Sequence, residues 1–155
     1  MSSATENQQD TIRNEVDIIP LIITRWNSSD KRATIREMFN SIKTTQVFKP
    51  LFLFGHDQIP VENLSEIIEE SQNYKDFIVP DVEDNYHTVA FKLLSAFHWI
   101  GDLGSTRLKW IIKMDDDIYI NVTKFDEYFL SQNNLDQEKF HCYETYTEPV
   151  RNPNR

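Results

Sequence analysis

The stretch KWIIKMDDDIYIN, residues 109–121, places Asp115, Asp116 and Asp117 in succession between two apolar, β-branched runs. Carboxylates repel one another and are costly to bury. Three of them beside strand-like segments therefore need a cation, a ligand or solvent to neutralise them. The run at residues 108–114 predicts a buried strand, so the cluster is expected at the carboxyl end of that strand.

Upstream of the aspartates, strand-like and helix-like segments alternate. Strands are expected at residues 17–26, 47–55, 76–81 and 108–114, and helices at residues 28–42, 59–74 and 84–101. This alternation predicts an α/β fold with an open, mostly parallel sheet flanked by helices. Ligands bind such sheets beyond the carboxyl ends of the strands, so the aspartates are expected at a binding edge.

The remaining segments are less periodic. Residues 1–16 are polar and are expected to form a disordered lead-in. After the aspartates, an extended continuation is expected at 118–121, a short helix at 123–132 and a strand at 138–146. In the helix over 84–101, one apolar stripe is expected to face the core, formed by Tyr86, Val89, Ala90, Leu93, Leu94, Phe97 and Ile100. In the helix over 59–74, the expected inward residues are Leu64, Ile67 and Ile68.

Composition limits the possible functions. The 155 residues are 39% hydrophobic, enough for one domain with a core. A formal net charge of −9 argues against a nucleic-acid partner or an anionic membrane surface. The single cysteine, Cys142, excludes an internal disulfide. No apolar run approaches the roughly 18–20 residues of a membrane span, so any membrane attachment would require an anchor that this sequence does not contain.

The aspartates have two possible interpretations from the residues alone. In an extended segment, Asp115 and Asp117 share one face and Asp116 points the other way. Two carboxylates on one face suit Mg²⁺ or Mn²⁺, which would leave open positions for a diphosphate, while Asp116 could accept hydrogen bonds from a sugar hydroxyl. The alternative is a fully solvated acidic turn at a strand end. A magnesium-dependent phosphoryl-transfer enzyme is a weaker possibility, because no glycine-rich phosphate loop accompanies the cluster.

Several segments together resemble one family. KWIIKMDDDIYIN resembles the K-x-DDD-V/I-x-x-N segment of the β-1,3-galactosyltransferase-like family (glycosyltransferase family 31, hexosyltransferases). Four further matches occur in the family's order: KRATIREMF at 31–39, LFLFG at 51–55, the block EESQNYKDFIVPDVEDNYHTVAFKLLSAFHWI at 69–100, and EPVRNPNR at 148–155. The sequence departs from the family at Met38-Phe39, where Thr-Trp is usual, and at Ala90-Phe91, which indicates altered packing.

The resemblance implies a GT-A-like nucleotide-sugar-transferase fold, dependence on Mn²⁺ (or Mg²⁺), a UDP-sugar donor and a glycan acceptor on a glycoprotein or glycolipid. It also implies inversion at the anomeric carbon and a location on the lumenal side of the Golgi membrane. By position, Asp115 and Asp117 would serve the metal and Asp116 the ribose or donor sugar. The other nucleotide-sugar residues implied are Thr24, Arg25, Arg36, Asp84 and Lys92.

Each of those residues also has a purely structural interpretation. Thr24 and Arg25 could simply end a strand. Arg36 could be a solvated helix charge or a structural partner for a carboxylate. Lys92 lies off the apolar stripe of its helix and could face water. Asp84 could be the N-cap of that helix.

The family's domain extends beyond the PVR segment to a later acidic motif, which holds the base that removes the acceptor's hydroxyl proton. Residues 17–155 are therefore expected to be the N-terminal, donor-binding part of a transferase domain, with the catalytic base beyond residue 155. The alternative is a fragment or pseudoenzyme that binds a nucleotide-sugar without catalysis. An uncovered sheet edge and apolar face would make such a part poorly stable.

Overall fold

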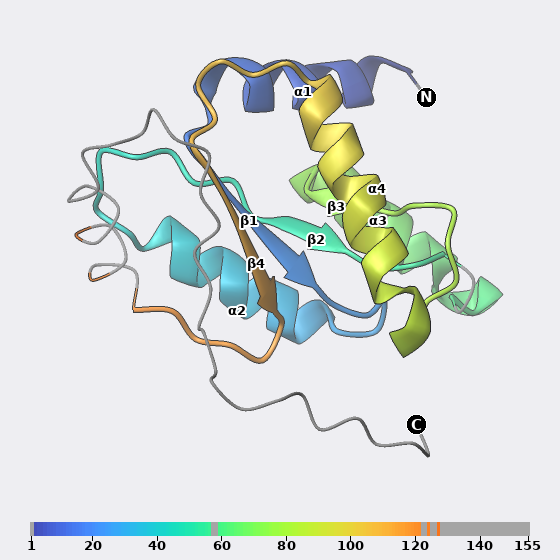
Figure 1. Ribbon diagram of the computed structural model, residues 1–155. Coiled ribbons are helices and arrows are strands. Elements are labelled where there is room, and N and C mark those ends of the chain that lie inside the picture. Colours follow the sequence, from blue (N-terminus) through green and yellow to red (C-terminus); the bar gives the residue numbers. More distant parts are fainter. Residues whose placement is uncertain (1, 57–58, 122–123, 125–126, 128–155) are drawn as a thin grey trace, which may run out of the picture.

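Four parallel strands form one sheet in the computed structural model, in the order β3-β2-β1-β4 (Figure 1). The strands are β1 (Ile18–Ile23), β2 (Leu51–Leu53), β3 (Phe77–Ile78) and β4 (Trp110–Asp115). The structure describes residues 2–56 and 59–121, together with residues 124 and 127. The prediction of an α/β fold with a parallel sheet is confirmed.

The central strand β1 tolerates Pro20 because of where its neighbours pair. β1 is matched to β4 along its whole length, from Ile18 opposite Trp110 to Ile23 opposite Asp115. Alternate residues of a strand direct their N–H groups to opposite sides, and the N–H groups of residues 18 and 24 face the β2 side. The missing N–H of Pro20 therefore also faces that side, where the β1–β2 ladder begins only at Leu21.

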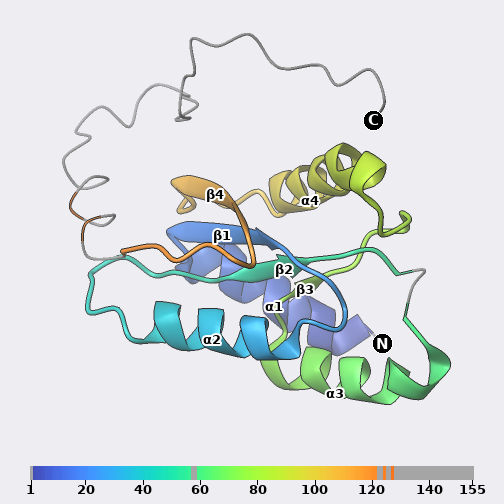
Figure 2. The ribbon, with the colours of Figure 1, turned by 90° about the horizontal axis from the view of Figure 1, so that it is seen from below.

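Helices cover both faces of the sheet. Figure 2 shows α2 (Ser29–Asn40) and α3 (Leu64–Tyr74) below the strands and α4 (Val89–Asp102) above them. Two short 3₁₀ helices, η1 (Val61–Asn63) and η2 (Tyr86–Thr88), precede α3 and α4. The first helix, α1 (Ser2–Glu15), crosses the amino-terminal end of the sheet.

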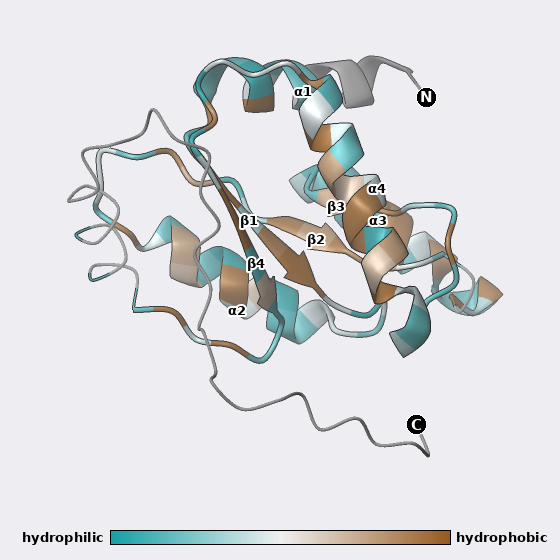
Figure 3. Ribbon diagram, viewed as in Figure 1, coloured by the Kyte–Doolittle hydropathy of each residue, from teal (hydrophilic) through white to brown (hydrophobic). Residues whose placement is uncertain are grey.

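Most strand residues are apolar, as the brown of Figure 3 shows, and strand side chains contribute to two separate buried clusters. On the α4 side, Leu21, Leu53 and Ala96 belong to one buried cluster. On the α2 side, Ile35 and Phe39 pack against strand residues that include Phe52. Both Ile35 and Phe39 are buried residues of α2.

The amino-terminal segment differs from the disordered lead-in expected over residues 1–16. It forms α1, and its Ile12 and Val16 are completely or almost completely buried in the core beneath α4. The guanidinium of Arg13 donates a 2.6 Å hydrogen bond to the carbonyl oxygen of Leu103. Two apolar residues four positions apart in a polar segment are a weak signal on their own, and tertiary packing stabilises this helix.

Two helices also differ from their predicted packing. The buried residues of α4 are Lys92, Ala96 and Ile100, which are spaced four apart. Much of the expected apolar stripe is exposed, including Tyr86, Leu94 and Phe97. Helix α3 has no fully buried residue, and two of its expected inward residues, Leu64 and Ile68, are exposed.

The chain turns directly after β4. Residues 116 and 117 form a turn, and the N–H of Ile118 lies 3.4 Å from the carbonyl oxygen of Asp115, so the expected extended continuation at 118–121 is not a strand. Of the helix predicted at 123–132, the structure describes residues 124 and 127, and both are helical. The strand predicted at 138–146 and the segment at 148–155 lie outside the described residues. Within the part that is described, no helix is long and apolar enough to cross a bilayer.

Candidate functional site

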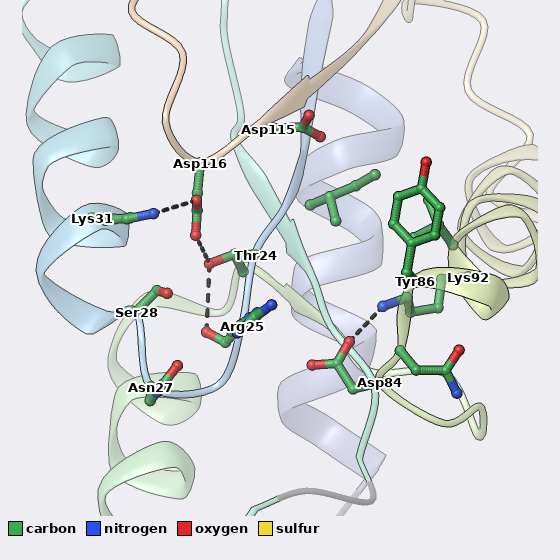
Figure 4. A pocket seen from close by; sticks show the side chains of 13 residues that line it. Thr24, Arg25, Asn27, Ser28, Lys31, Asp84, Tyr86, Lys92, Asp115 and Asp116 are labelled. Carbon is green, nitrogen blue, oxygen red and sulfur yellow. Dashed lines mark hydrogen bonds and ion pairs between the residues drawn. The ribbon is translucent and has the colours of Figure 1, made fainter. Parts of the chain in front are cut away.

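A cavity of about 520 Å³ opens at the carboxyl ends of β1 and β4 (Figure 4). The strand order reverses at this point, since β2 and β3 lie on one side of β1 and β4 on the other. Such reversals leave a crevice in which open α/β sheets bind ligands, and the volume suits a small organic ligand. The cavity is lined by Ile23, Thr24, Arg25, Asn27, Ser28, Lys31, Asp84, Asn85, Tyr86, Val89, Lys92, Asp115 and Asp116.

Asp116 joins the end of β4 to the start of α2. Its carboxylate accepts hydrogen bonds from the Thr24 hydroxyl at 2.8 Å and from the Lys31 ammonium at 2.7 Å. Burial alone would raise the pKa of Asp116, but the hydrogen bonds from Lys31, Thr24 and Ser28 outweigh it, so this pKa lies below its ordinary value. Asp116 is therefore ionised at neutral pH and is held in place by three donors.

Asp115 lines the cavity, whereas Asp117 does not. β4 ends at Asp115, and the turn that follows directs Asp117 to an exposed position outside the residues that line the cavity. The side chain of Asp115 is 51% exposed and accepts a 2.8 Å hydrogen bond from Lys113. The turn was not visible from alternation, and it brings Asp115 and Asp116, rather than Asp115 and Asp117, to the cavity wall.

The donors suit a divalent cation that arrives with phosphate. In the part of the chain described here, no group of three or more His, Cys, Asp or Glu side chains is placed to hold a metal. Asp115 immediately precedes the turn formed by residues 116 and 117, and the side chains of Asp115 and Asp117 are both accessible to solvent. Mg²⁺ and Mn²⁺ are often held by one or two carboxylates with the remaining positions taken by substrate phosphates and water. The residues present therefore fit a metal bound together with a diphosphate.

Asp84 and Lys92 meet at the opposite wall of the cavity. The Lys92 ammonium donates a hydrogen bond to the Asp84 carboxylate, and the two side chains are only 4% and 7% exposed. Lys92 therefore does not face water. Nor is Asp84 an N-cap, because Asn85 performs that function by accepting hydrogen bonds from the backbone N–H groups of residues 87 and 88.

A glycine makes this wall possible. Gly55, just after β2, passes so close to the loop before η2 that an added Cβ would lie 2.5 Å from the Val82 carbonyl oxygen and 2.7 Å from the Asp84 backbone nitrogen. Such distances are shorter than any normal contact. The backbone of the Asp84 loop is therefore set by the absence of a side chain at Gly55.

Arg36 lies away from the cavity. It forms two hydrogen bonds to Asp76, at 2.7 Å and 3.0 Å, and an ion pair with Glu70 at 2.8 Å, and its guanidinium lies over the ring of Tyr74. These contacts connect α2 to α3 and to the start of β3. Of the interpretations open from sequence, the structural partner of a carboxylate describes Arg36 best.

Sequence reasoning did not single out several residues that the fold brings to the cavity. Lys31 and Ser28 both contact Asp116, and Tyr86 stands on the rim with 84% of its surface exposed. Lys31 lies in the segment KRATIREMF, and its position in that segment was the available signal. Tyr86 was expected in the core because helical spacing was extended backwards into η2.

The charges of the cavity wall are balanced. The lining contains three carboxylates, from Asp84, Asp115 and Asp116, and three cations, from Arg25, Lys31 and Lys92. In this structure lysines neutralise the aspartates: Lys31 pairs with Asp116, and Lys113 with Asp115. A negatively charged ligand that carries a bound cation could therefore pair with both kinds of side chain. Its negative groups would pair with the cations of the wall, and its cation with the aspartates.

Comparison with known proteins finds one matching family model and several similar curated proteins. A family model described as Galactosyltransferase matches residues 30–154. The human and mouse proteins named beta-1,3-galactosyltransferase 1 are each 35% identical to this chain over 109 residues, which cover 68% of this chain and 32% of the relative. A Xenopus laevis lactosylceramide 1,3-N-acetyl-beta-D-glucosaminyltransferase B is 24% identical over 133 residues, covering 81% of this chain and 35% of the relative. The chain thus spans about a third of the length of the curated relatives it matches.

Proposed function

Because this chain belongs to the galactosyltransferase family, we propose that it carries the nucleotide-sugar-binding part of a metal-dependent β-1,3-hexosyltransferase. Its donor would be a UDP-sugar and its acceptor a glycan on a glycoprotein or glycolipid. Relatives named as galactosyl- and N-acetylglucosaminyltransferases support transfer of one of those two sugars. A Golgi location on the lumenal side is part of the same proposal.

The observation that carries the proposal is the convergence of Thr24, Arg25, Asp84, Lys92 and Asp116 on one cavity at the strand-order reversal. These residues come from four separate segments of the chain. Their assembly at this point of a parallel sheet is what a nucleotide site requires.

The cavity offers both kinds of group that a nucleoside diphosphate needs. Its cations, Arg25, Lys31 and Lys92, are placed on the wall where phosphate oxygens would accept hydrogen bonds. Lys31 is accessible to such a ligand, because its side chain is 52% exposed, and its ion-pair partner among the described residues is Asp116. Asp116 and Thr24, held together, would accept and donate hydrogen bonds to ribose or sugar hydroxyls.

A divalent metal, Mn²⁺ or Mg²⁺, would be held by Asp115 and Asp117. When bound, it would stabilise the negative charge that develops on the departing diphosphate. The flexible side chain of Lys113, now paired with Asp115, would be released into solvent as the metal takes its place. The chain's own contribution is to hold the diphosphate at the strand ends and to keep its oxygens close to fixed cations.

The base of an inverting transfer is not expected among the cavity's carboxylates. Asp84, Asp115 and Asp116 each contact a lysine ammonium, and the pKa of Asp116 lies below its ordinary value. This pairing also favours the second candidate function, in which the chain binds a nucleotide-sugar without performing the transfer. The two differ in one respect: a transferase requires a further carboxylate, supplied from elsewhere in the full protein.

Calorimetric titration tests the binding claim directly. UDP, ADP and inorganic phosphate are each titrated into the chain with Mn²⁺ present and again with EDTA. The proposal predicts that UDP binds with Mn²⁺, that EDTA weakens this binding at least tenfold, and that ADP binds more weakly than UDP. Equal binding of all three compounds would indicate a general anion site. Phosphate release without any sugar donor would instead indicate a phosphohydrolase.

A further inference from the structure

Arg32 is completely buried, although arginine is among the residues least often found in a protein interior. It lies in the first turns of α2, one residue after the cavity-lining Lys31. Its guanidinium faces the rings of Phe54 and Phe77, with centroid distances of 5.8 Å and 5.2 Å. A buried cation needs partners for its donors, and those partners reveal what it does.

Arg32 holds the loop that connects β1 to α2. Its Nη1 donates to the carbonyl oxygen of Arg25 at 2.6 Å, and its Nη2 donates to the carbonyl oxygen of Trp26 at 3.0 Å. The two carbonyl groups are adjacent in the chain, so the planar guanidinium fixes both the position and the direction of the peptide between them. Arg25 and the residues on either side of this peptide, Thr24 and Asn27, line the cavity.

The guanidinium is itself fixed from the other side. Glu70 of α3 accepts two hydrogen bonds from it, from Nε at 2.9 Å and from Nη2 at 2.6 Å. This two-point contact prevents rotation of the guanidinium plane. Arg32 thus transmits the position of α3 to the loop at the cavity, although Arg32 does not line the cavity itself.

The geometry points to Arg32 as a positioning residue that sets the β1–α2 wall of the cavity, residues 24–28, in the conformation that binds the nucleotide. This inference rests on the proposed function for its ligand. A lysine would not replace the arginine, because a single ammonium cannot hold two adjacent carbonyl oxygens and a carboxylate in one plane.

Arg36 provides a matched control. It lies one turn further along α2, is also buried and shares Glu70 as a partner. Its other hydrogen bonds go to Asp76, and none of its hydrogen bonds among the described residues reaches the β1–α2 loop. Both arginines stabilise the fold, but only Arg32 contacts the wall of the cavity.

The test compares Arg32→Lys and Arg32→Gln with Arg36→Lys in the full chain, using two measurements. The first is hydrogen–deuterium exchange of the peptide over residues 24–29 without ligand, relative to peptides from β1 and β2. The second is the dissociation constant for UDP with Mn²⁺. Two Arg32 variants are included so that the comparison remains possible if one fails to fold.

The expected result is faster exchange of the 24–29 peptide and about tenfold weaker UDP binding in the Arg32 variants, with both quantities within about twofold of wild type in Arg36→Lys. Equal effects in the two sets of variants would overturn the inference and leave Arg32 as a stabilising residue only. Faster exchange with unchanged UDP affinity would also overturn it. If wild-type protein does not bind UDP, the proposed function is wrong, and the exchange comparison still tests whether Arg32 orders this loop.

Discussion

Asp84 and Lys92 form an ion pair in which neither side chain is more than 7% exposed. The pair joins the loop before η2 to the second turn of α4 and forms one wall of the cavity at the strand ends. Because both charges are largely withdrawn from solvent, each depends on the other for stabilisation.

Loss of one member of this pair is expected to destabilise the protein severely. Lys92→Met should lower the free energy of unfolding by about 3–5 kcal/mol, because it leaves the Asp84 carboxylate buried without its ammonium partner. The measurement is urea unfolding followed by circular dichroism. The double variant Asp84→Asn/Lys92→Met should recover part of the loss, because no uncompensated charge remains.

Lys113→Met is the control for this experiment. Its partner Asp115 is half exposed, so the change should cost no more than about 1 kcal/mol. If Lys92→Met were as mild as Lys113→Met, the pair would contribute little and the description of that wall would be incorrect.

Gly55 and Gly101 should respond in opposite directions to alanine. Gly55→Ala places a Cβ within 2.7 Å of two backbone atoms of the loop before η2, and should cost about 1–3 kcal/mol. Gly101 lies in α4 with nothing within 4 Å of an added Cβ, so Gly101→Ala should stabilise by about 0.5–1 kcal/mol. Thermal unfolding of the two variants measures both effects, and an unchanged or raised melting temperature for Gly55→Ala would show that the loop is not in close contact.

Glu70 should make stability depend on pH in the acidic range. Burial would raise the pKa of Glu70, but hydrogen bonds from Arg32 and Arg36 outweigh it and lower the pKa below its ordinary value of 4.5. Since the folded state binds this proton less readily than the unfolded chain, the stabilisation is complete above about pH 5 and is lost as the pH falls through and below 4.5.

The matching variant is Glu70→Gln, which resembles the protonated acid. Its free energy of unfolding should lie below that of wild type at neutral pH, and the difference should shrink as the pH falls toward 3. Urea unfolding at several pH values measures this convergence. A difference that stays constant with pH would mean that the charge of Glu70 is not what stabilises the two arginines.

The outer face of α4 should promote self-association. Phe91 and Leu94 are 62% and 63% exposed there and lie three residues apart on one side of the helix. Exposed apolar groups of this kind favour association. The double variant Phe91→Gln/Leu94→Gln should show a lower apparent mass in light scattering at high concentration, with an unfolding free energy within about 0.5 kcal/mol of wild type. Identical association of the two proteins would show that another surface is responsible.

The sequence predicts the parallel sheet well because its signals are local. Apolar runs at 17–26 and 108–114, separated by helical periodicities, suffice to predict parallel strands with the aspartates at their carboxyl ends. The positions of Thr24 and Arg25 on the cavity follow from the same reasoning, since residues that directly follow a strand lie at this edge.

Features that depend on distant contacts could not be predicted in the same way. Whether Lys92 faces water or the interior depends on Asp84, eight residues earlier, and on the turn between them. The assignment of Arg36 to the nucleotide pocket came from a motif, whereas its partners Glu70 and Asp76 are more than thirty residues away in sequence. The turn at residues 116–117 brings Asp116, rather than Asp117, to the cavity beside Asp115. Alternation along a strand contains no information about where that strand ends.

The most direct test of the account is calorimetric titration of UDP with Mn²⁺ into three proteins: wild type, Asp115→Asn/Asp116→Asn and Asp117→Asn. Mn²⁺-dependent binding is expected for wild type and is expected to be lost in the double variant, while circular dichroism shows that the variant remains folded. The effect of Asp117→Asn then shows whether this exposed carboxylate joins Asp115 at the metal. Undiminished binding by a folded double variant would contradict the proposal that the cavity at the ends of β1 and β4 is the nucleotide site.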